Sequence, residues 1–242
     1  MSIRRRILGI SDSKAVFVPA WRAPEYFELM VRLTGKARPN ACYIGAAKGD
    51  NPERIGAFFE LANRVGCSPS ALRLFSMTTE NPDAYFSNSD LIFIDGGVTR
   101  NLVALMREWN VIEPLLKAYE RGALIVGASA GISMLFDWCV SDSVRTKMLP
   151  VRGIGLLKGA VCAHYDVSSE RRSVLHGMMQ DDRYNALPAY GLEDGVSVLF
   201  EDESIVKVYA ASEKGKAYIF HDRASLNAPQ IRFGDQIQKS FV

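Results

Sequence analysis

The chain has 242 residues, of which 48% are apolar and 23% are charged. This composition is typical of globular proteins and excludes a disordered, collagen-like or coiled-coil chain. The 29 lysines and arginines nearly balance the 27 aspartates and glutamates, so the net charge of +2 gives no indication of a nucleic-acid or membrane partner. No apolar run approaches the roughly 18 residues that cross a bilayer.

Short apolar runs alternate with helical patterns through the first half of the chain. Residues 1–20 are basic and then apolar, but four consecutive polar residues interrupt the apolar stretch, so we interpret it as a first strand rather than a signal peptide. Residues 41–47 predict a buried strand, and residues 51–66 have apolar side chains at helical spacing. Two further strands are expected at residues 71–75 and 90–97.

The middle of the chain continues this alternation. Residues 102–122 predict helical segments that end at a glycine, and residues 123–128 predict a strand that leads directly into a short apolar helix over 129–136. Alternating strands and helices of this kind favour a parallel sheet covered on both faces.

Beyond about residue 195 the chain is richer in short strands separated by polar turns. We expect strands in four segments: 197–202, 204–210, 216–220 and 230–233. We interpret them as antiparallel strands that close one edge of the same sheet. No linker or repeat divides the chain, so we expect one α/β domain over residues 1–242.

The four cysteines are Cys42, Cys67, Cys139 and Cys162. They lie far apart without a CxxC pair, so metal-ligand spacing is absent. A chain of this length and apolar content does not need disulfides, and free thiols in a cytoplasmic protein are the expected state.

The sharpest local pattern is GASAG at residues 127–131, in which Ser129 follows an expected strand and opens an expected helix. A nucleophile on such a tight turn needs small neighbours, and the start of the helix supplies free N–H groups for a developing oxyanion. The plain alternative is a turn of small residues that packs the helix closely on the sheet. A glycine pair after the strand at 90–97 suggests that Gly97 and Ala130 present the two amides of an oxyanion hole.

Three histidines are candidates for the base. His164 follows the apolar run AVCA and should lie at the carboxyl end of a strand, on the same edge as Ser129. His176 lies on an amphipathic helical pattern and His221 in a polar turn, where ordinary surface roles are favoured. His164 is therefore the preferred base.

The orienting acid is less well defined. The turn GLEDG offers Glu193 and Asp194, and the rival carboxylates Asp137, Asp142 and Asp166 are not excluded by spacing.

These motifs occur in a characteristic order: DGGVT, GASAG, AHYD, SERR and GLEDG. In this order the sequence resembles the serine peptidases of the dipeptidase E and cyanophycinase group, family S51, over roughly residues 40–210. The resemblance implies a flavodoxin-like three-layer fold, akin to class I glutamine amidotransferases, with a mostly parallel sheet.

The resemblance also implies a triad. Ser129 corresponds to the nucleophile and His164 to the base, and Asp194 stands where the family has glutamate. Because aspartate is one methylene shorter, Glu193 remains an alternative. Val98 also departs from the family, which usually has a polar residue there, and this bears on substrate identity.

The same family favours an aspartyl residue on the acyl side of the cleaved bond, which implies a cationic pocket. Arg171, Arg172 and Arg100 are the candidates to bind the carboxylate, although the first two are also compatible with a solvated first helical turn. The expected partner is a small peptide substrate. No metal or organic cofactor is implied, and a homodimer stays open.

Two other classes of function remain at this stage. An esterase of the α/β-hydrolase type would use His221 as base, with Asp166 or a nearby carboxylate as acid. A non-catalytic relative would bind a small ligand at the same site.

Overall fold

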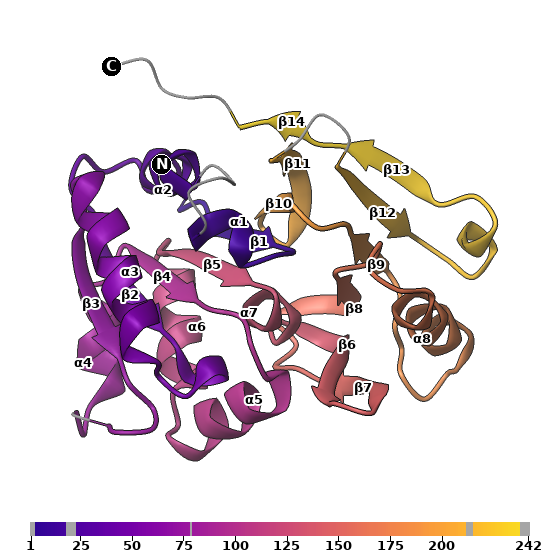
Figure 1. The fold of residues 1–242 in the computed structure, drawn as a ribbon, viewed down its shortest axis with the longest axis horizontal. Helices are drawn as coiled ribbons and strands as arrows, with labels where there is room; N and C mark the ends of the chain where they lie inside the picture. Colours follow the sequence, from indigo (N-terminus) through magenta and orange to yellow (C-terminus); the bar gives the residue numbers. More distant parts are fainter. Residues whose placement is uncertain (1–2, 18–22, 78, 212–214, 238–242) are drawn as a thin grey trace.

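A computed structural model describes residues 3–17, 23–77, 79–211 and 215–237 of the chain (Figure 1). Within these residues the larger of two sheets has eight strands, in the spatial order β14 (Asp235–Gln236), β11 (Ser204–Ala210), β10 (Val196–Glu201), β1 (Arg6–Ile10), β5 (Leu124–Ala128), β4 (Leu91–Ile94), β2 (Asn40–Ile44) and β3 (Ser68–Leu72). The five strands from β1 to β3 in this order are parallel. The strand β10 pairs antiparallel with both β1 and β11.

Helices cover both faces of the large sheet. The described helices are α1 (Lys14–Phe17), α2 (Ala23–Thr34), α3 (Pro52–Arg64), α4 (Pro82–Ser87), α5 (Thr99–Glu108), α6 (Ile112–Glu120), α7 (Ala130–Ser133) and α8 (Ser169–Gln180), with 3₁₀ turns η2 (Ala46–Lys48) and η3 (Ala224–Leu226). Neighbouring strand residues point to opposite faces: in β4, Ile92 packs with α5 and α6, and Phe93 packs with α2 and α3. Because both faces are buried, these strands are continuous apolar runs, as the sequence predicts.

The smaller sheet has six described strands, in the order β13 (Gln230–Phe233), β12 (Lys216–Phe220), β9 (Ala189–Leu192), β8 (Leu157–Ala163), β6 (Phe136–Val144) and β7 (Lys147–Arg152). It lies beside the large sheet, with α8 packed against it (Figure 1). One face of this sheet shares a core with the large sheet through Phe136, Val161 and Leu192.

The architecture confirms an α/β fold with a mostly parallel sheet between helical layers, and it is consistent with a flavodoxin-like arrangement. It corrects one detail of the C-terminal expectation. Residues 197–202 and 204–210 do extend the large sheet, but residues 216–220 and 230–233 belong to the second sheet. The strand β12 pairs with β9 instead, which places part of the tail next to the GLEDG turn. The single-domain assignment for residues 1–242 stays a prediction.

Two short segments also differ from expectation. The strand expected at 71–75 is β3, which ends at Leu72. The apolar run 129–136 is helical only from Ala130 to Ser133, because the chain then enters β6 at Phe136. No described helix combines the length and the hydropathy needed to cross a membrane.

Several carboxyl ends of parallel strands meet at one edge of the large sheet. Ser11 follows β1, η2 follows β2, Asp95 follows β4 and Ser129 follows β5. In open α/β sheets, ligands bind at this edge.

Candidate active site

Ser129 stands on a strained turn between β5 and α7. Its φ of 52° and ψ of −108° are rare for a residue with a side chain, and such strain is typical of functional positions. The turn requires its glycines, because a Cβ on Gly131 would lie 2.0 Å from the carbonyl oxygen of Ile94 and one on Gly127 would lie 2.6 Å from the amide nitrogen of Ile132. The small residues of GASAG therefore allow the helix to approach the sheet closely enough to present Ser129.

His164 follows β8 and faces Ser129. Its Nε2 atom lies 2.9 Å from Ser129 Oγ. Its φ of 57° is also in the left-handed region. The backbone is anchored there because the His164 amide donates to Ser11 Oγ at 2.8 Å, and the Ser11 hydroxyl donates to the Leu192 carbonyl at 2.9 Å. Buried Ser11 thus links the end of β1 to both the histidine and the strand that leads to GLEDG.

Asp194 contacts the other nitrogen of the imidazole, His164 Nδ1, through its carboxylate. The Asp194 amide donates to Asp166 Oδ1 at 2.8 Å, so this rival acid holds the loop that carries Asp194. A carboxylate on Nδ1 favours the tautomer that carries its proton there, which leaves Nε2 free to accept the Ser129 proton.

Glu193 points away from the imidazole. Its carboxylate accepts hydrogen bonds from the Lys216 amide and the Tyr218 hydroxyl, each at 3.0 Å. Both donors lie on β12, the strand that joins the second sheet. Glu193 therefore ties the turn to that sheet.

The remaining titratable candidates have other partners. His176 Nε2 lies 2.8 Å from Tyr165 Oη, and burial together with the nearby positive charge of Arg172 lowers the pKa of His176. His221 is exposed, and its Nε2 atom lies 3.1 Å from Gln230 Oε1. Asp137 accepts the Gly159 amide at 3.1 Å. None of these interactions involves Ser129.

The glycine loop after β4 packs against Ser129. A Cβ on Gly96 would lie 2.7 Å from Ser129 Cβ, so only glycine permits this approach. Gly97 has a φ of 140°, and a Cβ there would lie 2.2 Å from the carbonyl oxygen of Ala47. Within the described part of the chain, the amides of Gly97 and Ala130 have no hydrogen-bond acceptor. Both residues line the cavity in front of Ser129.

Asp95 anchors this loop from the interior. Its side chain is fully buried and accepts hydrogen bonds from the Gly96 amide at 2.7 Å, Tyr43 Oη at 2.8 Å and Arg54 Nε at 2.8 Å. Burial, together with the Asp95 charge, raises the pKa of Tyr43 well above its ordinary value. The buried charge is therefore balanced by the Arg54 guanidinium, as a buried carboxylate requires.

Lys48 is a third charged residue beside Asp95 and Arg54. Its Nζ donates to the Gly96 carbonyl at 2.7 Å and lies 3.6 Å from Asp95 Oδ1. Burial lowers the pKa of Lys48, and the Asp95 charge opposes this effect. Lys48 and Arg54 belong to none of the motifs that the sequence predicts for the site. The available signal was their place in the segment that directly follows the strand of residues 41–47, at the same sheet edge as Ser129.

The cavity at Ser129 has a volume of about 380 Å³. Besides the imidazole, its described lining includes four basic and two acidic residues: Lys14, Lys48, Arg54, Arg171, Asp12 and Asp142. It can hold a small ligand, and its charges suit an anionic one. Among the described residues no cluster of three or more histidine, cysteine or acidic side chains could hold a metal ion.

Of the three arginines expected to bind a carboxylate, Arg171 lies in the described lining of this cavity. It is only 7% exposed and donates from Nη2 to Asp142 Oδ2 at 2.7 Å, but its Nε is buried without a described hydrogen-bond partner. Arg172 instead donates to the Tyr165 carbonyl at 3.2 Å. Arg172 and the exposed Arg100 are not among the described residues that line the cavity.

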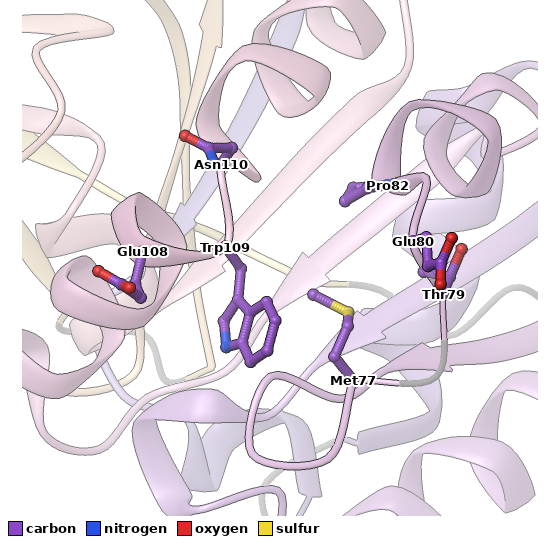
Figure 2. A pocket seen from close by; sticks show the side chains of 7 residues that line it. All are labelled: Met77, Thr79, Glu80, Pro82, Glu108, Trp109 and Asn110. Carbon is purple, nitrogen blue, oxygen red and sulfur yellow. The ribbon is translucent and has the colours of Figure 1, made fainter.

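A larger pocket of about 490 Å³ lies elsewhere, between the loop before α4 and the end of α5. Figure 2 shows Met77 pointing toward the Trp109 ring in this pocket. The described lining consists of Met77, Thr79, Glu80, Pro82, Glu108, Trp109 and Asn110. It contains no histidine or cysteine and shares no residue with the cavity at Ser129, so we place the chemistry at Ser129.

All four cysteines are buried free thiols. Burial raises the pKa of Cys42, Cys139 and Cys162 to about 12 and that of Cys67 to about 11. Thiols in this state are poor nucleophiles.

The chain is similar to known proteins in both sequence and fold. Residues 8–208 match the family model described as peptidase family S51. The chain is 28% identical over 191 residues to the uncharacterized peptidase YgaJ of Bacillus subtilis (strain 168), covering 79% of this chain and 82% of that relative. Among solved structures it is similar to a peptidase from an acI-B1 Actinobacterium, with a TM-score of 0.72, 14% identity, and coverage of 95% of this chain and 94% of the other. The structural likeness shows the fold.

Proposed function

The chain belongs to peptidase family S51 and is a serine peptidase, and we propose that it cleaves small peptides after an aspartyl or β-aspartyl residue through the triad Ser129, His164 and Asp194. The observation that carries the triad is the 2.9 Å separation of Ser129 Oγ and His164 Nε2, with Asp194 on the opposite ring nitrogen. A nucleophile, a base and a group that orients the base are the parts that acyl transfer needs.

The reaction proceeds in two halves. Ser129 Oγ attacks the carbonyl carbon while His164 Nε2 takes the hydroxyl proton, and the negative charge collects on the former carbonyl oxygen. The Gly97 and Ala130 amides, which have no other described acceptor, stabilise this oxyanion. When the C–N bond breaks, the leaving amine takes the proton from His164, and an acyl ester of Ser129 remains.

Water completes the cycle. His164 takes a proton from water as the water oxygen attacks the acyl carbon, and it returns that proton to Ser129 Oγ when the ester bond breaks. The products are the free carboxylic acid and the regenerated serine. Asp194 stabilises the imidazolium in both halves.

Arg171 supports the acidic specificity. Arg171 lies in the cavity lining, where its positive charge would attract a ligand carboxylate. Asp142 accepts from Nη2 at 2.7 Å, and the Ala163 carbonyl accepts from Nη1 at 3.5 Å, so these two contacts hold the guanidinium in place. A guanidinium is a common partner for carboxylates in proteins, which supports recognition of an aspartyl side chain.

A substrate screen tests the proposal. Wild-type protein and Ser129→Ala are assayed on Asp-X dipeptides, β-aspartyl dipeptides, matched Asn-X dipeptides and short esters. We expect wild type to cleave one of the two aspartyl series in preference to Asn-X, and Ser129→Ala to be inactive. Equal cleavage of Asp-X and Asn-X contradicts the specificity, and an active Ser129→Ala contradicts the nucleophile.

A further inference from the structure

Two hydrogen bonds from η2 hold the glycine loop on either side of Gly97. Lys48 Nζ donates to the Gly96 carbonyl at 2.7 Å, and the Val98 amide donates to the Ala47 carbonyl at 2.8 Å. Ala47 and Lys48 are neighbours in the same short turn. The Gly96–Gly97 peptide is therefore held by one hydrogen bond at its own carbonyl and by a second at the next-but-one residue, Val98.

The orientation of this peptide decides where the Gly97 amide points. In a planar trans peptide the C=O and N–H groups point in opposite directions, so fixing one direction fixes the other. The backbone of Gly97 gives little resistance to a flip, because glycine adopts positive and negative φ with similar ease and Gly97 has a φ of 140°. An external anchor on the Gly96 carbonyl is therefore needed to keep the amide in one direction.

We infer that Lys48 is a positioning residue that anchors the Gly96 carbonyl and so presents the Gly97 amide to the oxyanion. The inference rests on the proposed function, because it assigns Gly97 to the oxyanion hole. Lys48 acts through the peptide and stabilises the transition state without touching the substrate.

Asp95 supports this role from behind. Its Oδ1 atom accepts the Gly96 amide at 2.7 Å and lies 3.6 Å from Lys48 Nζ. One buried carboxylate thus fixes the peptide before Gly96 and attracts the ammonium that fixes the peptide after it. The competing role for this ammonium is direct attraction of an anionic substrate, because Lys48 lines the cavity.

A fluorophosphonate probe separates the two roles. It reacts with an activated serine and places a phosphoryl oxygen in the oxyanion hole, but it carries no carboxylate. Loss of a substrate-binding cation should leave its labelling rate unchanged, whereas loss of the peptide anchor should slow it. We expect Lys48→Met to lower both the labelling rate at Ser129 and kcat by about 10- to 100-fold, somewhat less than the loss of a whole oxyanion donor. KM for a peptide should stay within about 3-fold.

Lys14 provides the matched control. It is exposed at the rim of the same cavity, and its side chain has no hydrogen bond to the described residues. Lys14→Met removes the same charge without touching the glycine loop, so its labelling rate should equal that of wild type. A Lys14→Met loss equal to that of Lys48→Met would overturn the inference, because charge alone would then explain the effect.

A second variant guards against a folding defect. Lys48→Cys can be aminoethylated, which restores an ammonium at nearly the original length, while the four native cysteines are buried. Labelling should be slow before this modification and recover after it. Wild-type rates in Lys48→Met, or no change on aminoethylation, would overturn the inference. If the wild-type protein itself is not labelled at Ser129, the proposed function fails, and the inference fails with it.

Discussion

Glu193 and Asp194 are neighbours in the chain, but their carboxylates bind on opposite sides of the turn between β9 and β10. Asp194 contacts His164 Nδ1, whereas Glu193 accepts the Lys216 amide and the Tyr218 hydroxyl of β12. Asp194 therefore contacts the imidazole of the candidate triad, and Glu193 binds the turn to a strand of the second sheet. The shorter aspartate reaches the imidazole even though the family resemblance implies a glutamate at this position.

The first prediction separates these two roles. Asp194→Asn should lower kcat by about 10²- to 10⁴-fold with little change in stability, because an amide favours the wrong tautomer of His164 and does not stabilise the imidazolium. Glu193→Gln should keep kcat within about 3-fold but lower the free energy of unfolding by about 1 kcal/mol, because the amide nitrogen cannot accept one of the two hydrogen bonds. Steady-state kinetics and urea unfolding measure both effects. Reversed kinetic results would assign the orienting role to Glu193.

The sequence predicted the central strands well for a physical reason. The strands β2, β4 and β5 are buried on both faces, so each is a continuous apolar run bounded by polar or glycine residues. The turn that carries Ser129 is also predictable, because a strand, GASAG and a helix follow one another within a few residues. The structure brings Ser129, His164 and Asp194 together, while their catalytic roles stay a prediction.

Contacts between residues far apart in the chain could not be predicted from the sequence. The strand β12 is too short to reveal that it pairs with β9 instead of the edge of the large sheet, because pairing depends on distant residues. The apolar run 129–136 predicts one helix, because an apolar segment alone does not distinguish a buried helix from a buried strand. The contact of Lys48 with Gly96 joins residues 48 positions apart, and no local sequence pattern predicts it.

A second prediction concerns the base. His164→Ala should lower kcat/KM by at least about 10³-fold, because the members of a triad act as a unit. His221→Ala should stay within about 3-fold, since His221 is exposed and its partner is Gln230. The two variants are compared on the same peptide. An inactive His221→Ala with an active His164→Ala would support the chain order of an α/β-hydrolase instead.

A third prediction concerns the thiols. With pKa values near 11 or 12, well under about 1% of each native cysteine is thiolate at pH 8, and all four are buried. Iodoacetamide at pH 8 should therefore leave activity intact. Ser129→Cys is the positive control, because a thiol beside His164 should be alkylated rapidly. Stoichiometric loss of wild-type activity with one labelled native cysteine would argue against a serine nucleophile.

The fourth prediction tests the close packing of the turn at Ser129 by comparing substitutions of two helical glycines. Gly131→Ala would place a Cβ 2.0 Å from the Ile94 carbonyl oxygen, so we expect a loss of at least about 2 kcal/mol in the free energy of unfolding. Gly56→Ala, in α3, has no atom within 4 Å of the new Cβ and should gain about 0.5–1 kcal/mol from helix propensity. Urea unfolding curves measure both. Equal stability of the two variants would mean that α7 does not need its close approach to β4.

The last prediction concerns the acidic specificity. Arg171→Met removes one of the cations in the cavity lining, and the loss of a charge-assisted hydrogen bond of about 1.5–3 kcal/mol corresponds to roughly a 10- to 100-fold rise in KM for an aspartyl peptide. Cleavage of an uncharged ester and labelling by a fluorophosphonate should change by less than about 3-fold, because neither carries a carboxylate for Arg171 to bind. Asp142, which loses its partner, is 56% exposed at the side chain and can be solvated, and the Ala163 carbonyl loses a long hydrogen bond of 3.5 Å, so the fold should tolerate the change.

Arg172→Met is the matched control for this experiment. Arg172 is adjacent in the chain but donates to backbone carbonyls, including that of Tyr165, and lies outside the described cavity lining. Its KM for the aspartyl peptide should therefore remain within about 3-fold of wild type. If Arg172→Met raises KM and Arg171→Met does not, the substrate carboxylate binds on the other side of α8 from the one that the cavity indicates. If both variants slow the ester and the fluorophosphonate equally, the arginines support the fold of the His164 loop, and the acidic preference requires another cation.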